Sequence, residues 1–242
     1  MKNWKVLALA GLAALILASS VFAKVSAPLA RILTPPTNST IKVIDETTLT
    51  GTPTPLASAA VILKDSRYST SPPIVSRTNR VGEARFNLRT IEYDCTLVKR
   101  GYKTKSMPEA FMKRTEDLTF NTSMRPLRPF PSGEMIYLKI FVIRGLTSGP
   151  PASGILVEVR PEGLTAPEIS DYGVQGVTGS DGRVRLRVPA TAERRYLVAV
   201  DERSGKYKIK DISIYKIWPD GNVTIPGVAA SDIPQPLWIG LP

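Results

Sequence analysis

The chain has 242 residues, of which 43% are hydrophobic, and its formal net charge is +11. It contains no histidine and one cysteine, which excludes Ser-His-Asp catalysis, Cys-His catalysis and a zinc site of His and Cys ligands within this chain. The 17 glycines and 21 prolines favour many turns and short strands over long helices.

The first 23 residues have the pattern of a secretory signal peptide. Lys2 and Lys5 precede an apolar run over residues 6–17, and the small residues that follow end at Ala23. The alternative is an uncleaved membrane anchor, because residues 6–23 are long enough for a span of about 17–25 residues. Both alternatives predict a secreted or cell-surface protein, which contacts a membrane only through this segment if it is uncleaved.

If the chain is exported, its net charge and its single cysteine have further implications. Without Lys2 and Lys5, 30 of the 32 basic residues remain against 21 acidic ones, a net charge of +9 that favours acidic partners. An exported chain with only Cys95 forms no internal disulfide, so we expect Cys95 to be a small buried hydrophobic residue. The scarcity of labile side chains favours a thermophilic, prokaryotic source.

Residues 24–39 form an apolar tail that ends in a Pro-Pro break, and a first unit of short strands follows over residues 40–124. In the stretch GEARFNLRT, Ala84, Phe86 and Leu88 alternate with polar residues, which is the period of a half-buried strand. The unit continues with YDCTLVKRGYKTK and closes with EDLTFNT at residues 116–122.

Residues 125–134 contain three prolines and predict a semi-rigid linker to a second unit over residues 135–229. There Val184, Leu186 and Val188 alternate with arginines, as in the first unit. Residues 230–242 are predicted to be a C-terminal tail.

The second unit repeats the first. Thr78 and Thr178 each precede a glycine by four residues, Gly82 and Gly182, and each glycine begins an alternating strand. We expect RYLVAV to match YDCTLV, with Tyr196, Val198 and Val200 standing where Tyr93, Cys95 and Leu97 stand, and GNVTIPG at residues 221–227 to match EDLTFNT. The predicted fold is all-β: two tandem Ig-like or transthyretin-like β-sandwiches after an N-terminal signal helix.

Both units resemble the carboxypeptidase regulatory-like domain, a transthyretin-like β-sandwich, over residues 40–124 and 136–228. The resemblance implies a non-catalytic accessory or structural module, and it brings no catalytic residues. Arg80-Val81 before Gly82 and the inserted Lys206 depart from the family pattern. The pattern is carried by Val43, Asp45, Pro53, Val61, Leu63, Thr78, Gly82, Phe86, Tyr93, Gly101 and Tyr102, and by Val157, Val159, Thr178, Asp181, Gly182, Leu186, Tyr196, Gly205 and Tyr207.

Three groups of residues are candidate contact or modification sites. Three sequons predict glycosylation, unless the source lacks the machinery. Two rows of cations would form one basic stripe for an acidic polymer if their strands are neighbours, although a solvated sheet face is the plainer interpretation. Apolar residues in both tails either fold back on their own sandwiches or add a strand to a neighbouring copy. The candidates are Asn38, Asn121 and Asn222; Arg183, Arg185, Arg187, Lys206, Lys208 and Lys210; and Leu29, Ile32, Leu33, Leu237, Trp238 and Ile239.

Three functions remain open from the sequence. The first is a non-catalytic structural or adhesive surface protein, whose partners are other surface proteins or copies of itself. The second is a secreted accessory module that binds a glycan or a peptide, with the loop 163–177 and an exposed Tyr172 as its contact. Acidic glycans are possible partners because of the positive net charge. The third is an enzyme built on carboxylates that converge from different strands. No cofactor motif is present, and we do not expect a nucleic-acid partner for an exported chain without interleaved aromatic platforms.

Overall fold

The computed structural model describes residues 37–48, 52–66, 71–88, 92–112, 118–145, 147–161, 171–190, 193–214, 216–224 and 236–242. The predicted leader and Leu29, Ile32 and Leu33 lie outside these residues. The regular structure of the described residues is β-strand, apart from a 3₁₀ turn at Glu46–Thr48 and the 3₁₀ residue Asp171, so the all-β prediction is confirmed. No helix within the described ranges is long and apolar enough to cross a membrane.

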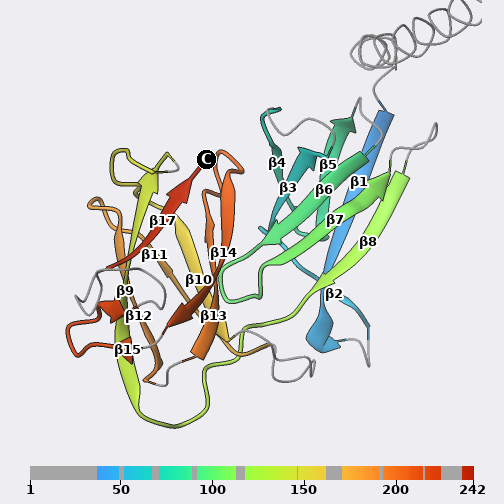
Figure 1. Cartoon of the computed structure of the whole chain (residues 1–242). Helices are drawn as coiled ribbons and strands as arrows, with labels where there is room; N and C mark the ends of the chain where they lie inside the picture. Colours follow the sequence, from blue (N-terminus) through green and yellow to red (C-terminus); the bar gives the residue numbers. More distant parts are fainter. Residues whose placement is uncertain are drawn as a thin grey trace, which may run out of the picture.

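The N-terminal sandwich consists of two four-stranded sheets (Figure 1). In its outer sheet, β5 and β2 pair with successive parts of one side of β1, and β8 pairs with the other side. Its inner sheet has the order β4-β3-β6-β7. The strands are β1 (Thr37–Asp45), β2 (Thr54–Pro55), β3 (Ala60–Asp65), β4 (Ile74–Arg77), β5 (Glu83–Leu88), β6 (Glu92–Val98), β7 (Lys105–Met112) and β8 (Leu118–Met124).

The C-terminal sandwich has the same plan. Its outer sheet has the order β12-β9-β17, its inner sheet has the order β11-β10-β13-β14, and β15 and β16 form a separate hairpin. The strands are β9 (Met135–Arg144), β10 (Leu156–Pro161), β11 (Val174–Val177), β12 (Arg183–Pro189), β13 (Glu193–Val200), β14 (Tyr207–Ile214), β15 (Lys216–Ile217), β16 (Val223–Thr224) and β17 (Leu237–Leu241).

The last strand of each sandwich returns to pair in parallel with the first. β8 pairs with β1, and β17 pairs with β9. The counterpart of β8 is therefore β17, and the expected match of GNVTIPG with EDLTFNT is wrong. The predicted tail residues Leu237 and Ile239 are 0% and 2% exposed in the core of their own sandwich. This burial supports the fold-back alternative, and their role as assembly contacts stays a prediction.

The repeated turn has the same geometry in both sandwiches. The Thr78 hydroxyl donates to the Leu56 carbonyl at 2.6 Å and accepts from the Ala59 amide at 2.9 Å. The Thr178 hydroxyl donates to the Ala152 carbonyl at 2.6 Å and accepts from the Ile155 amide at 3.0 Å. Each threonine thus ties its turn to the loop before the inner sheet.

The glycines of this turn are required by its backbone. Gly82 and Gly182 have φ of +76° and +71°. A Cβ atom on either would lie 2.5 or 2.6 Å from a carbonyl oxygen, that of Val43 or Val142. A larger residue would be both strained and too close to the first strand.

Each sandwich has its own core from the alternating positions of its strands. Ile41, Val61 and Phe86 belong to the N-terminal core, and Ile140, Val157 and Leu186 to the C-terminal one. Cys95 is buried, and burial raises the pKa of its thiol to about 12, so its prediction as a small buried hydrophobic residue is confirmed.

A third apolar cluster joins the inner sheets of the two sandwiches. It consists of Ala60, Ile62 and Val98 on the N-terminal side and Leu156, Val198 and Val200 on the C-terminal side. β3 and β13 are therefore buried on both faces, which explains their nearly continuous apolar sequences.

The match between β6 and β13 that the sequence predicts is wrong by one residue. Leu63 pairs with Cys95 in β6, and Val159 pairs with Leu197 in β13. Leu197 thus stands where Cys95 stands, whereas Val198 and Val200 face the other sandwich. The sequence does not show the correct match, because the alternation of apolar and polar residues disappears when both faces of a strand are buried.

Polar contacts fix the two sandwiches to each other. The Glu158 carboxylate, 1% exposed, accepts hydrogen bonds from the Thr104 amide at 3.1 Å and hydroxyl at 2.7 Å. The Gln175 side-chain amide donates to Glu158 and to the Tyr102 carbonyl, both at 2.8 Å. Arg77 and Glu202 form a further ion pair at 2.6 Å. The domain boundaries predicted above stay predictions.

Candidate ligand-binding face

The outward-facing positions of β9, β12 and β17 place aromatic and basic side chains on one surface, which we call the C-terminal outer face. In β9, Tyr137, Lys139 and Phe141 alternate with core residues. Across the antiparallel ladder these three pair with Arg187, Arg185 and Arg183, and Phe141 also pairs with Trp238 of β17.

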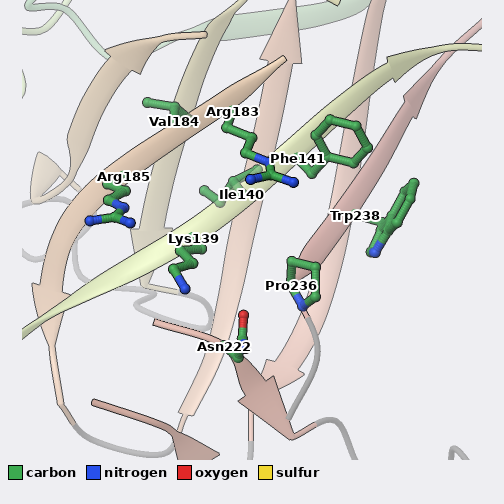
Figure 2. Close-up of a pocket in the computed structure, with 9 residues that line it drawn as sticks. All are labelled: Lys139, Ile140, Phe141, Arg183, Val184, Arg185, Asn222, Pro236 and Trp238. Carbon is green, nitrogen blue, oxygen red and sulfur yellow. The ribbon is translucent and has the colours of Figure 1, made fainter. Parts of the chain in front are cut away.

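The centre of this face is hollowed into a groove of about 360 Å³ (Figure 2). Phe141 and Trp238 form its aromatic side, with ring centroids 4.7 Å apart and planes at 83°. The Arg183 guanidinium lies 5.7 Å from the Phe141 ring centroid, a cation–π arrangement. The groove is lined by Lys139, Ile140, Phe141, Arg183, Val184, Arg185, Asn222, Pro236 and Trp238.

A turn between β15 and β16 closes one end of the groove. The Lys139 amide donates to the Gly221 carbonyl at 2.8 Å, and the Trp218 amide donates to Asn222 at 2.9 Å. The Trp218 indole donates to the Thr224 hydroxyl at 3.0 Å. These bonds place Asn222 beside Lys139, as Figure 2 shows.

The charge of this face is positive and weakly compensated. Its outward positions hold Lys139, Arg183, Arg185 and Arg187 and no carboxylate. Asp220 lies 3.9 Å from Lys139, and Asp181 lies 3.9 Å from Arg183, both at the margin. Such a surface attracts anions, and its arginines can bind planar oxyanions through two hydrogen bonds.

The predicted cation rows do not form one stripe. Arg183, Arg185 and Arg187 are exposed on β12 of the outer sheet. Lys208 and Lys210 belong to β14 of the inner sheet, and exposed Lys206 precedes it. The condition for a single stripe, neighbouring strands, is therefore not met; Lys210 reaches the outer sheet only through a 3.3 Å bond from its ammonium to the Trp238 carbonyl.

The structure separates the three sequons. Asn38 and Asn121 are exposed on β1 and β8, on the outer sheet of the N-terminal sandwich. Asn222 is half-buried in the groove, and its side-chain amide donates to Asp220 at 2.6 Å. Glycosylation itself stays a prediction at all three.

Two further predictions change with the structure. Tyr172 is half-buried and forms a β-bridge with Arg128, so its prediction as an exposed contact is wrong. Trp238 is 46% exposed on the outer face, unlike its buried neighbours Leu237 and Ile239.

Sequence reasoning missed Tyr137, Lys139 and Phe141. Their signal was present, because they occupy alternate positions in MIYLKIFVIR as the arginines do in RVRLRVP. Only strand pairing shows that both sets share one face. Within the described residues, no group of three or more His, Cys, Asp or Glu side chains could hold a metal ion.

No protein-family model matches the chain, and no curated protein matches it. Among solved structures, it is similar to the Bacillus anthracis TIE protein, at 12% identity and TM-score 0.29, over 85% of this chain and 33% of that one. It is similar to a streptococcal ancillary pilin, at 13% identity and TM-score 0.30, over 87% of this chain and 63% of that one. It is similar to a DUF3823 family protein from Parabacteroides merdae, at 12% identity and TM-score 0.30, over 73% of this chain and 92% of that one.

The chain thus spans a third of the first of these proteins and less than two thirds of the second. Likenesses this distant assign no function to it, and the resemblance to carboxypeptidase regulatory-like domains stays a hypothesis.

Proposed function

We propose that this chain is a non-catalytic, exported or cell-surface binding protein whose C-terminal outer face binds an acidic glycan. The observation that carries the proposal is the groove in which Phe141 and Trp238 lie beside Arg183 and Lys139. The resemblance to an accessory-domain family and the apolar leader support a non-catalytic role outside the cytoplasm.

The groove has the chemistry that such a ligand requires. Aromatic rings offer flat apolar surfaces on which the apolar face of a sugar ring can stack. Arginines spaced by two residues along β12 lie about 7 Å apart and can pair with successive carboxylate or sulfate groups of a polymer. Trp238 is the expected centre of affinity, because half-exposed tryptophans dominate many binding surfaces.

The fixed arrangement of the sandwiches suits a structural or adhesive role. The shared apolar cluster and the Glu158 hydrogen bonds hold the groove in one orientation relative to the N-terminal sandwich. Partners on the cell surface and copies of the chain remain proposals. Donation of β17 to a neighbour is not proposed, because β17 completes its own core.

The test is a binding titration of the purified protein with heparin, polygalacturonate, neutral dextran and single-stranded DNA. We expect binding to the two acidic polysaccharides only, and a rise in Kd of about tenfold or more for Trp238→Ala. Asn121→Ala is the matched control, since Asn121 occupies the corresponding position on the N-terminal sandwich. Equal binding by both variants would contradict the proposal, as would tighter binding to single-stranded DNA than to either polysaccharide.

A further inference from the structure

A second hollow, of about 470 Å³, lies between the two sandwiches. Its N-terminal side consists of the 3₁₀ turn after β1, the turn before β7, the start of β7, the end of β8 and Arg125 directly after it. Its C-terminal side consists of Arg160 of β10 and Ile209 of β14. We call it the junction cleft; its lining residues are Glu46, Lys103, Thr104, Lys105, Ser106, Ser123, Arg125, Arg160 and Ile209.

Four cations and one carboxylate line the junction cleft. Arg125 pairs with Glu46 at 2.7 Å and lies 3.6 Å from Asp171, which is also 4.0 Å from Lys103. The Lys105 ammonium donates to the Thr122 hydroxyl at 3.3 Å and the Ser123 carbonyl at 3.1 Å, both neutral acceptors. Among the residues that the structure describes, these four cations outnumber the three carboxylates Glu46, Asp171 and Glu158.

The cleft is built from fixed side chains. The Arg160 Nε lies 2.8 Å from Glu158, a carboxylate that the hydrogen bonds from Thr104 and Gln175 hold in place. The Arg160 side chain is 15% exposed and the Lys103 side chain 25%. Cations held in partly desolvated positions lose little entropy when an anion binds.

The surroundings of Lys103 affect its protonation. Burial, and after it the charge of Arg160, lowers the pKa of the Lys103 ammonium. A bound anion would oppose both effects, because an opposite charge favours the protonated form.

We propose that the junction cleft binds a small oxyanion, a phosphate or sulfate group, between Lys103, Lys105 and Arg160. The Thr104 and Ser106 hydroxyls lie at the same cleft and supply further donors. A ligand here contacts both sandwiches and therefore stabilises their packing. This site is separate from the C-terminal outer face and does not depend on the function proposed for it.

The test is calorimetric titration of the purified protein with inorganic phosphate, inorganic sulfate and glucose 6-phosphate, each against chloride at equal ionic strength. We expect saturable binding and a saturable rise in Tm. Tighter binding of the sugar phosphate would identify a phosphorylated sugar as the source of the group, and equal or weaker binding would identify the free oxyanion. No saturable binding of any of the three would overturn the proposal.

Two variants make the titration specific. Lys105→Gln removes a cleft cation and should raise the Kd about tenfold. Lys206→Gln removes an exposed cation outside the cleft and should leave the Kd unchanged. An equal effect of both variants would show that only overall charge matters and would overturn the site.

A labelling experiment needs no variant. Phosphate should slow the amine-reactive labelling of Lys103 and Lys105, read by mass spectrometry, and leave that of Lys206 unchanged. Uniform labelling rates with and without phosphate would contradict the proposed site.

Discussion

The outer sheets of the two sandwiches share a fold and differ in almost every outward side chain. Lys42 of β1 pairs with Glu83 and Asn121. The corresponding residue of β9, Phe141, pairs with Arg183 and Trp238. The N-terminal face is thus polar and nearly charge-balanced, whereas the C-terminal face is basic and aromatic.

The two sequon asparagines of the N-terminal face sharpen this difference. Asn38 and Asn121 stand where Tyr137 and Trp238 stand on the C-terminal face. One face therefore carries predicted glycosylation sites at the positions where the other carries aromatic rings. Because the cores and the repeated turns agree, we expect stability to depend on the shared residues and the proposed binding to depend on the outward ones.

The largest expected effect tests whether β17 is a core strand. Leu237→Ala should lower the free energy of unfolding by about 2–5 kcal/mol, because Leu237 is 0% exposed. Trp238→Ala, one residue away and 46% exposed, should cost about 1 kcal/mol or less. Urea denaturation measures both. Unchanged stability of Leu237→Ala together with an altered oligomeric state would restore the assembly-tail hypothesis.

The repeated turn provides a matched pair of variants. Thr78→Val and Thr178→Val each remove a hydroxyl that makes two buried hydrogen bonds. Each should lower the free energy of unfolding by about 1–3 kcal/mol, and by similar amounts. A loss confined to one variant, measured by thermal and urea unfolding, would show that the two turns are not energetically equivalent.

The third prediction converts one face into the other. Arg183→Glu with Arg187→Asn gives β12 the residues found at Glu83 and Asn87. We expect the Kd for heparin to rise about tenfold, or about 1.4 kcal/mol, and its salt dependence to weaken. The reverse change, Glu83→Arg with Asn87→Arg, should create no comparable binding because that face lacks the aromatic rings. Gain of binding there would show that charge alone suffices.

The smallest effect concerns an ion pair that only the N-terminal sandwich has. The hydrogen bond from Arg125 lowers the pKa of the Glu46 carboxyl below its usual 4.5, and Gly145 stands at the corresponding position of the other sandwich. A carboxyl whose pKa is lower in the folded state than in the unfolded state stabilises the fold at pH values above its unfolded-state pKa. This stabilisation is lost as the pH falls through its folded-state pKa. Arg125→Gln should therefore be slightly less stable than the wild type at pH 7. The difference should shrink as the pH falls below 4.5 and disappear below the folded-state pKa of Glu46. A constant difference across this range would contradict the assignment.

Much of each sandwich follows from local sequence. Alternation in GEARFNLRT and RVRLRVP predicts which residues of β5 and β12 are buried, because side chains along a strand point to opposite faces. The threonine and glycine of each turn, the burial of Cys95 and the exposure of the arginine row are local properties of the same kind.

The tertiary structure decided what local patterns cannot carry. The register of β13 was hidden because Val198 and Val200 are buried against the other sandwich, which removes the polar face. Leu237 is buried because β17 pairs in parallel with β9, and these two strands are the last and the first of the C-terminal sandwich in the sequence. The groove likewise needs β9, β12 and β17 side by side, and strand pairing between distant segments leaves no periodic mark in any one of them.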